Sequence, residues 1–306
     1  MKHINPIYKV LCLLWAVVGL TACEDVIDVD LDKGEPQLVV DAWVTNQPGA
    51  QTIRLTWSAP YFDSAPAKGV EDAEVSIKDS EGNVYTFENQ NNGDYTWAPA
   101  NPDEPLGKIG NKYTLTIRQG GETFQATSSL NDVPAIDSIA IEYKEKSLEG
   151  PEGHYAQFYA RDLEGLGDCY WIKAYKNGVF LNKPSEINLA YDAGFNKGSK
   201  VDNLVFLEPI REGINPFPDE QEEDDEVPPY AIGDSIYVEI FSLTEETFDF
   251  MVFIREQMQN GGFFATPPAN SPTNIVNLDD KSTVQALGFF NTSAVSSLGT
   301  KVTDKE

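Results

Sequence analysis

The chain has 306 residues, of which 41% are hydrophobic and 23% charged, a composition typical of a folded protein of about two domains. Its 22 Lys and Arg stand against 49 Asp and Glu, a net charge of −27 that disfavours nucleic-acid binding, because phosphates are bound mainly by Lys and Arg. Three cysteines and two histidines are too few for a disulfide framework or a zinc cluster, so neither a metal nor another bound cofactor is expected.

Residues 1–22 have the features of a signal peptide. Lys2 and Lys9 give a basic start, and the apolar segment at 10–20 is shorter than the roughly 20 residues that a transmembrane helix needs. The segment Leu20-Thr21-Ala22-Cys23 resembles the bacterial lipobox, in which the cysteine thiol receives a diacylglycerol. We therefore expect lipidation at Cys23 and a chain that is anchored to the lipid bilayer without spanning it.

After an acidic tether at residues 23–36, residues 37–133 carry the alternating pattern of short β-strands. Ile53 and Leu55, for example, alternate with polar residues, which places the apolar side chains on one face of a strand. A turn at 79–83 between two such runs predicts a hairpin. About seven short strands over this length predict an immunoglobulin- or transthyretin-like sandwich.

Residues 134–306 predict a second β-rich domain with one helix. Apolar and polar residues alternate at 236–240, and Asn177-Gly178 is typical of a tight hairpin turn. The helix is expected at about 244–259, where Ser242-x-x-Glu245 resembles a capping box. The fold class expected for the whole chain is therefore mainly β.

An acidic block interrupts this second half. Seven carboxylates fall within the eight residues 219–226, and prolines flank the block on both sides. Like charges repel and proline limits regular structure, so the block is expected to form a mobile loop. Weak association with Ca²⁺ is the alternative, although the block lacks the ligand spacing of a preorganised calcium site.

The sequence offers no catalytic motif. It contains no nucleophile elbow, Walker loop or dinucleotide fingerprint. Beyond Cys23, only His154 and Cys169 remain after processing; His154 is expected in a solvent-facing turn and Cys169 in the core. No catalytic residue is assigned and a non-enzymatic role is expected, while a hydrolase that uses two of the many carboxylates stays an alternative.

Aromatic residues suggest a second kind of site. Sugar rings stack on flat aromatic faces, but most of the aromatics here lie in strand patterns, which favours core packing for Trp43, Trp57, Trp97 and Trp171. Tyr61 and Phe62 follow Ala59-Pro60 and are the least strand-like pair. They are the candidates for an exposed ligand-binding surface.

Several segments resemble a family of Bacteroidetes outer-membrane lipoproteins of unknown function, which are often encoded beside TonB-dependent receptors. The segments are residues 23–31, 38–45, 58–62, 69–75, 136–139, 263–275 and 286–290. Glu24-Asp25 also resembles the surface-export signal of such lipoproteins, but the Lys or Gln that often precedes the acidic pair is missing, so the leaflet stays open. The family carries no established catalytic residues to transfer.

The resemblance implies a surface-anchored lipoprotein of the outer membrane. The expected role is a ligand-binding or accessory subunit of a TonB-dependent nutrient uptake system, with a TonB-dependent outer-membrane receptor as a possible partner. A cell-surface glycan-binding or adhesion module is the alternative, and the hydrolase is the third possibility.

Overall fold

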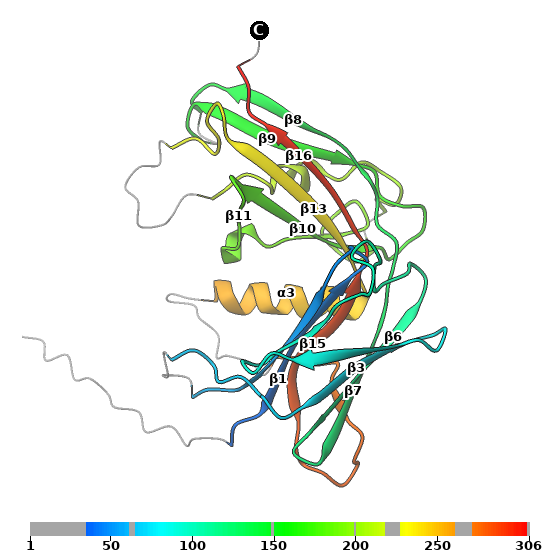
Figure 1. The fold of residues 1–306 in the computed structure, drawn as a ribbon. Coiled ribbons are helices and arrows are strands. Elements are labelled where there is room, and N and C mark those ends of the chain that lie inside the picture. Colours follow the sequence, from blue (N-terminus) through cyan, green and yellow to red (C-terminus); the bar gives the residue numbers. More distant parts are fainter. Residues whose placement is uncertain are drawn as a thin grey trace, which may run out of the picture. The chain divides into compact units, whose positions relative to one another are not determined.

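The computed structural model describes residues 35–60, 65–147, 150–198, 200–217, 227–260 and 271–304 (Figure 1). The predicted signal peptide, Cys23, Tyr61, Phe62 and the acidic block 219–226 lie outside the described residues. The chain divides into two units, residues 1–35 and 36–306.

The protein is mainly β, which confirms the predicted fold class. Nine strands form one sheet in the order β14-β7-β6-β3-β4-β5-β2-β1-β15. These strands are β1 (Leu38–Thr45), β2 (Gln51–Trp57), β3 (Glu74–Asp79), β4 (Val84–Asn89), β5 (Asp94–Trp97), β6 (Lys112–Gln119), β7 (Glu122–Ser129), β14 (Val276–Asn277) and β15 (Ala286–Ser293).

This large sheet is nearly closed around one apolar core. Strand β4 joins the two halves of the ladder, because its first part pairs with β3 and its last two residues, Glu88 and Asn89, pair with β5. The ends of the ladder approach each other where β15 contacts β7. The alternation expected from the sequence holds along the strands: Ile53 and Leu55 of β2, for instance, are both fully buried. Two facing halves therefore enclose the core, as in a sandwich, although their strands form one continuous ladder.

The remaining strands build two smaller sheets. One has the order β11-β10-β13-β16, with β12 also paired to β10, and the other pairs β8 with β9. These strands are β8 (Ile136–Lys144), β9 (Gly153–Ala160), β10 (Cys169–Lys176), β11 (Val179–Phe180), β12 (Asn188–Tyr191), β13 (Ser235–Leu243) and β16 (Val295–Lys301). They enclose a second core around Phe158, Phe206 and Tyr230.

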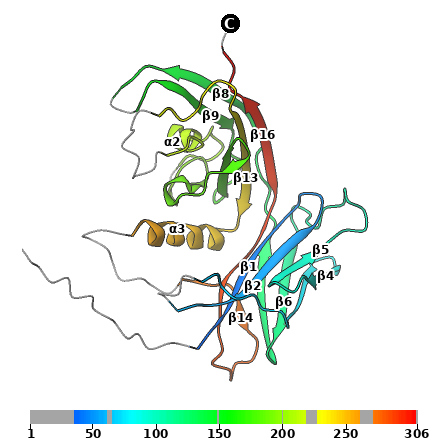
Figure 2. The same ribbon diagram turned by 60° about the vertical axis from the view of Figure 1, so that its left-hand side comes forward.

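Short helical segments pack against these smaller sheets: Ile210 of one belongs to the second core, whereas Phe248 and Met251 of another belong to a third buried cluster. The segments are the 3-10 turn η1 (Pro184–Glu186), the short helix α2 (Glu208–Glu212) and the longer helix α3 (Glu245–Gln259). Helix α2 packs against β9, and α3 lies between the large sheet and the sheet of β10 and β13 (Figure 2). In the part of the chain that the structure describes, no helix is both long and apolar enough to cross a membrane.

The strand pairing does not follow the predicted division into 37–133 and 134–306. Strand β15, near the C-terminus, pairs in parallel with β1 over its whole length, from Leu38 opposite Ala286 to Thr45 opposite Ser293. Only Ala294 separates β15 from β16, so the chain passes directly from the large sheet into the smaller one. Such long-range parallel pairing leaves no local signal in the sequence.

The predicted helix is present as α3, but its N-terminus differs from the expectation. Thr244 is the N-cap, and its hydroxyl accepts a hydrogen bond from the backbone N–H of Thr247 at 3.2 Å. Ser242 still belongs to β13, where its hydroxyl donates to the backbone oxygen of Asn131 at 2.8 Å. The capping box predicted for Ser242 and Glu245 is therefore wrong: the strand continues further than the motif suggested.

Candidate functional site

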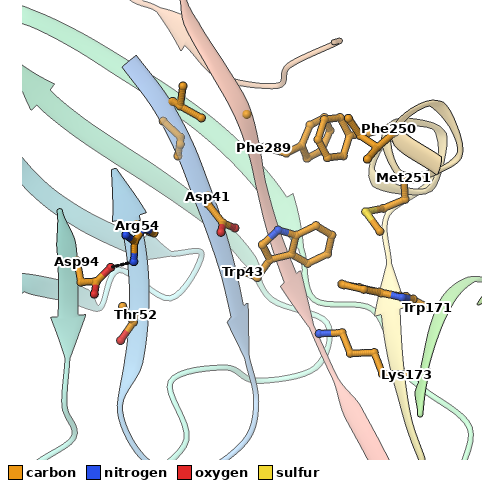
Figure 3. A pocket seen from close by; sticks show the side chains of 14 residues that line it. Asp41, Trp43, Thr52, Arg54, Asp94, Trp171, Lys173, Phe250, Met251 and Phe289 are labelled. Carbon is orange, nitrogen blue, oxygen red and sulfur yellow. Dashed lines mark hydrogen bonds and ion pairs between the residues drawn. The ribbon is translucent and has the colours of Figure 1, made fainter. Parts of the chain in front are cut away.

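An open cleft of about 650 Å³ lies between the large sheet, strand β10 and helix α3 (Figure 3). Its walls come from segments far apart in the sequence, which the pairing of β1 with β15 and the position of α3 bring together. Small-molecule sites typically occupy about 300–1,000 Å³ and combine an apolar lining with a few placed polar groups. The cleft has both properties.

The first wall is the outer face of the large sheet. Because side chains alternate along β1, Val40 and Ala42 point into the core while Asp41 and Trp43 line the cleft. The register of β15, β1, β2 and β5 then sets one row of side chains across this face: Phe289, Asp41, Arg54 and Asp94.

The second wall is strand β10, again through alternation. Ile172 and Ala174 are buried in the second core, whereas Trp171 and Lys173 line the cleft. The rings of Trp43 and Trp171 meet edge-on across the two walls, with centroids 5.4 Å apart. This contact is in the range in which aromatic pairs stabilise each other.

Helix α3 supplies the third wall. Phe250, Met251 and Ile254 of the helix line the cleft, and Phe250 stacks on Phe289 of β15 with centroids 4.4 Å apart. The helix is thus tied to the large sheet by a ring contact at the edge of the cleft. Apolar side chains cover three sides of the site (Figure 3).

The charged groups of the large sheet are only partly paired. Arg54 Nη1 lies 3.2 Å from Asp94 Oδ1, an ion pair between cross-strand neighbours. Asp41 is also a cross-strand neighbour of Arg54, but within the described ranges its carboxylate has neither a hydrogen bond nor an ion pair. Asp41 is reached by solvent in the cleft, yet the surrounding protein desolvates it enough to raise its pKa, against the opposing fields of Arg54 and Lys173.

Lys173 is the other charged group of the cleft. Its ammonium lies 4.0 Å from the ring centroid of Trp171 and 3.9 Å from that of Phe241. Burial lowers the pKa of Lys173 to about 8, although the nearby carboxylates of Glu239 and Asp41 favour its charged form. Over the described part of the chain, no oxygen accepts a hydrogen bond from this ammonium and no ion pair includes it.

The residues singled out in the sequence have varied positions. Cys169 is buried, as predicted, and burial raises the pKa of its thiol to about 12. His154 is the second residue of β9, half-buried, and its ring contacts Tyr143, so it does not lie in a free turn. Cys169 instead contacts Gly167, and no interaction links the thiol to His154.

The aromatic residues divide into two groups. Trp57 and Trp97 pack against the core of the large sheet, as the sequence predicts. Trp43 and Trp171 pack against a smaller buried cluster that includes Leu243 and Phe248, and they also line the cleft, which the sequence did not predict. Sequence reasoning also missed Asp41 and Lys173. The signal was present in both strands, because each charged residue lies two positions from a tryptophan on the same strand face.

A group of carboxylates at the start of β10 has a structural explanation. Asp192 Oδ1 accepts hydrogen bonds from the backbone N–H groups of Gly167 and Asp168, at 2.7 and 3.0 Å. Asp162 accepts one from the hydroxyl of Tyr170 at 2.8 Å, and burial raises the pKa of Asp162 to about 6. Within the described residues, no group of three or more His, Cys, Asp or Glu side chains is arranged to hold a metal ion.

Comparison with known proteins gives one family. The family model described as "Domain of unknown function (DUF4249)" matches residues 24–298, which include all three walls of the cleft. No curated protein matches the chain.

Proposed function

The chain belongs to the DUF4249 family of domains of unknown function, so the family does not supply a role. From the cleft, we propose that it is a lipid-anchored, non-enzymatic protein that binds a small amphipathic ligand. The observation that carries this proposal is the cleft itself. Four aromatic rings line it, yet among the described residues Asp41 and Lys173 have neither a hydrogen-bond partner nor an ion-pair partner for their charged groups. Exposed aromatic surface and uncompensated charge both destabilise a fold, so their combination in one concave site favours a binding role.

The residues of the cleft support binding more than catalysis. Asp94 is held in an ion pair by Arg54, and Thr52 Oγ1 shares a hydrogen bond with Thr96 Oγ1 at 3.1 Å. Asp41 is then the one lining carboxylate, among the described residues, that is not held by a partner. A hydrolase of the two-carboxylate type needs a second one that can act as acid, base or nucleophile.

The glycan-binding alternative has less support from this site. Sugar rings stack on broad aromatic faces, whereas Trp43 and Trp171 meet edge-on and Phe250 covers Phe289. A compact ligand that inserts among the rings matches this arrangement better. The ligand trials below therefore include oligosaccharides as a competing class.

The proposal includes the location and the partner. The lipobox at residues 20–23 would place a diacylglycerol on Cys23, and the resemblance to Bacteroidetes lipoproteins favours the outer membrane and a TonB-dependent receptor as partner. In that arrangement the cleft would hold a nutrient near the receptor. Isolation of the lipidated protein in mild detergent tests the partner: co-purification of a large β-barrel receptor supports it, and a protein that purifies alone contradicts it.

Cys23→Ala is expected to release the protein from the membrane. The substitution removes the thiol that would carry the lipid, and the mature chain would keep no other anchor in this proposal. Phase separation in detergent, with and without the substitution, measures the effect, and Cys169→Ala is the matched control because Cys169 is buried. A Cys23→Ala protein that still enters the detergent phase would contradict the lipid anchor.

Ile254→Trp is expected to block the cleft. Ile254 lines the cleft from α3, so a larger ring at this position should fill the space that a ligand needs. The neutral fluorescent probe N-phenyl-1-naphthylamine should bind the unmodified protein, and Ile254→Trp should weaken its binding by about tenfold or more. Competition with oligosaccharides and with small apolar molecules shows which class occupies the same space.

Met258→Trp is the matched control for this experiment. Met258 lies one turn further along α3, is 53% exposed and does not line the cleft. The control protein should bind the probe as the unmodified protein does. Absence of probe binding to the unmodified protein, or equal binding by Ile254→Trp, would overturn the proposed function.

A further inference from the structure

The ammonium of Lys173 has an unusual environment for a strand lysine. The side chain extends from β10 toward the cleft, next to the ring of Trp171 (Figure 3), and its ammonium lies about equally close to the ring of Phe241. The ring of Phe180 is the third aromatic near it, 5.8 Å from the ammonium. The aromatic rings contact the ammonium through cation–π interactions. A ring is nevertheless a poor substitute for oxygen acceptors, which the three N–H groups of an ammonium need.

The two nearby carboxylates do not pair with it. Glu239 lies opposite Lys173 on β13, but Glu239 Oε2 accepts a hydrogen bond from the hydroxyl of Tyr175 at 2.9 Å. Asp41 lies on the opposite wall and forms no ion pair with Lys173. A lysine that faces an apolar cleft without an anion is costly, because desolvation of its charge is not compensated.

Resting on the proposed function, we propose that the ligand is a compact amphipathic carboxylate whose anionic group binds the ammonium of Lys173 and whose apolar body lies among Trp43, Trp171 and Phe289. The ligand would supply the acceptor oxygens that the protein does not. A hydrogen bond between an ammonium and a carboxylate in a partly desolvated site is among the stronger polar contacts.

The other charges of the cleft fit this orientation. Arg54, the second cation of the cleft, is already paired with Asp94 and about half of its side chain is exposed, which leaves Lys173 as the better anion site. Asp41 on the opposite wall would repel a carboxylate placed beside it. The anionic end is thus directed toward β10, and the apolar body toward β1 and β15.

Three ligands of the same shape test the inference: phenylbutyrate, phenylbutanol and phenylbutylamine, titrated calorimetrically at pH 7. The unmodified protein should bind the carboxylate about 10- to 100-fold more tightly than the alcohol, and the amine most weakly. Lys173→Met should abolish the preference for the carboxylate while it leaves the affinity for the alcohol within about twofold. Lys173→Arg should restore part of the preference.

Asp41→Asn is a control that should change the affinity for the carboxylate in the opposite direction to Lys173→Met. It removes the negative charge that faces Lys173, so the carboxylate should bind a few-fold more tightly. A loss of the preference in Lys173→Met, together with a gain in Asp41→Asn, is specific to charge recognition, because general damage to the site would weaken both.

Failure of this inference differs from failure of the proposed function. If the alcohol binds as tightly as the carboxylate, or if Lys173→Met keeps the preference, the anion site is wrong although the cleft still binds ligands. If none of the three compounds and no neutral probe binds, the proposed function itself is wrong.

Discussion

Gly288→Ala is expected to destabilise the protein by more than about 4 kcal/mol, or to prevent folding. Gly288 lies in β15 with a φ of 89°, a conformation that residues with a side chain rarely adopt. A Cβ atom at this position would lie 1.9 Å from the backbone oxygen of Val40 on the paired strand β1. The clash is with backbone and not with a flexible side chain, so relief requires the two strands to separate.

Strand separation would affect both the core and the cleft. The pairing of β1 with β15 adds the edge strand of the large sheet, and it also sets Asp41 beside Phe289 in the cleft. Urea unfolding followed by tryptophan fluorescence measures the loss, with soluble yield as the readout if the variant does not fold. Residual protein should also bind the neutral probe less tightly.

Gly82→Ala is the matched control. Gly82 has a similar φ of 97°, but a Cβ atom there meets nothing within 4 Å. Its substitution should cost only the strain of the left-handed conformation, about 1–2 kcal/mol. If Gly288→Ala costs no more than Gly82→Ala, the close approach of β15 to β1 is wrong.

The sequence predicts the local structure of this protein well. Alternation identifies buried pairs such as Ile53 and Leu55, Asn177-Gly178 forms the turn between β10 and β11 with positive φ at both residues, and the helix lies where it was predicted. Each of these features depends on neighbours within a few residues. Residues close together in the sequence are therefore sufficient to predict these local features.

The sequence does not predict the long-range arrangement. Leu38 pairs with Ala286, and no local pattern records a contact between residues so far apart. The cleft depends on that pairing, so its residues were recognised only as strand positions. Trp43 and Trp171 are an example. Alternation places each of them on the strand face that points away from the core of its own sheet, but only the three-dimensional structure shows that these two strand faces meet.

Lys173→Met is expected to raise the free energy of unfolding by about 2–3 kcal/mol at pH 7, since burial lowers the pKa of Lys173 from 10.5 to about 8. A lowered pKa means that the folded state holds the proton less tightly than the unfolded state. Below about pH 8 both states carry the charge, and the folded state bears the full cost of its desolvation. Methionine has a similar length and no charge, so it removes this cost and keeps the contacts with Trp171 and Phe241.

The effect of Lys173→Met on the free energy of unfolding should depend on pH. Between pH 8 and 10.5 the folded protein releases the proton of Lys173 while the unfolded chain retains it. The contribution of Lys173 to the free energy of unfolding of the unmodified protein therefore rises with pH across this interval. The gap between Lys173→Met and the unmodified protein should therefore be largest below pH 8 and close as the pH approaches 10.5. Taking the difference between the two proteins cancels the titration of tyrosines and other groups that they share.

Lys78→Met is the control, because Lys78 is an exposed lysine of β3, in the large sheet. Its substitution should change the free energy of unfolding by less than about 0.5 kcal/mol. A Lys173→Met protein that is less stable at pH 7, or a gap that does not change with pH, would show that the ammonium is well solvated in the free protein. Lys173→Met is instead expected to be more stable and also to lose carboxylate binding. That result would mean that Lys173 destabilises the ligand-free protein and stabilises the complex. The favourable partner of its ammonium is then the ligand and not another residue of the chain.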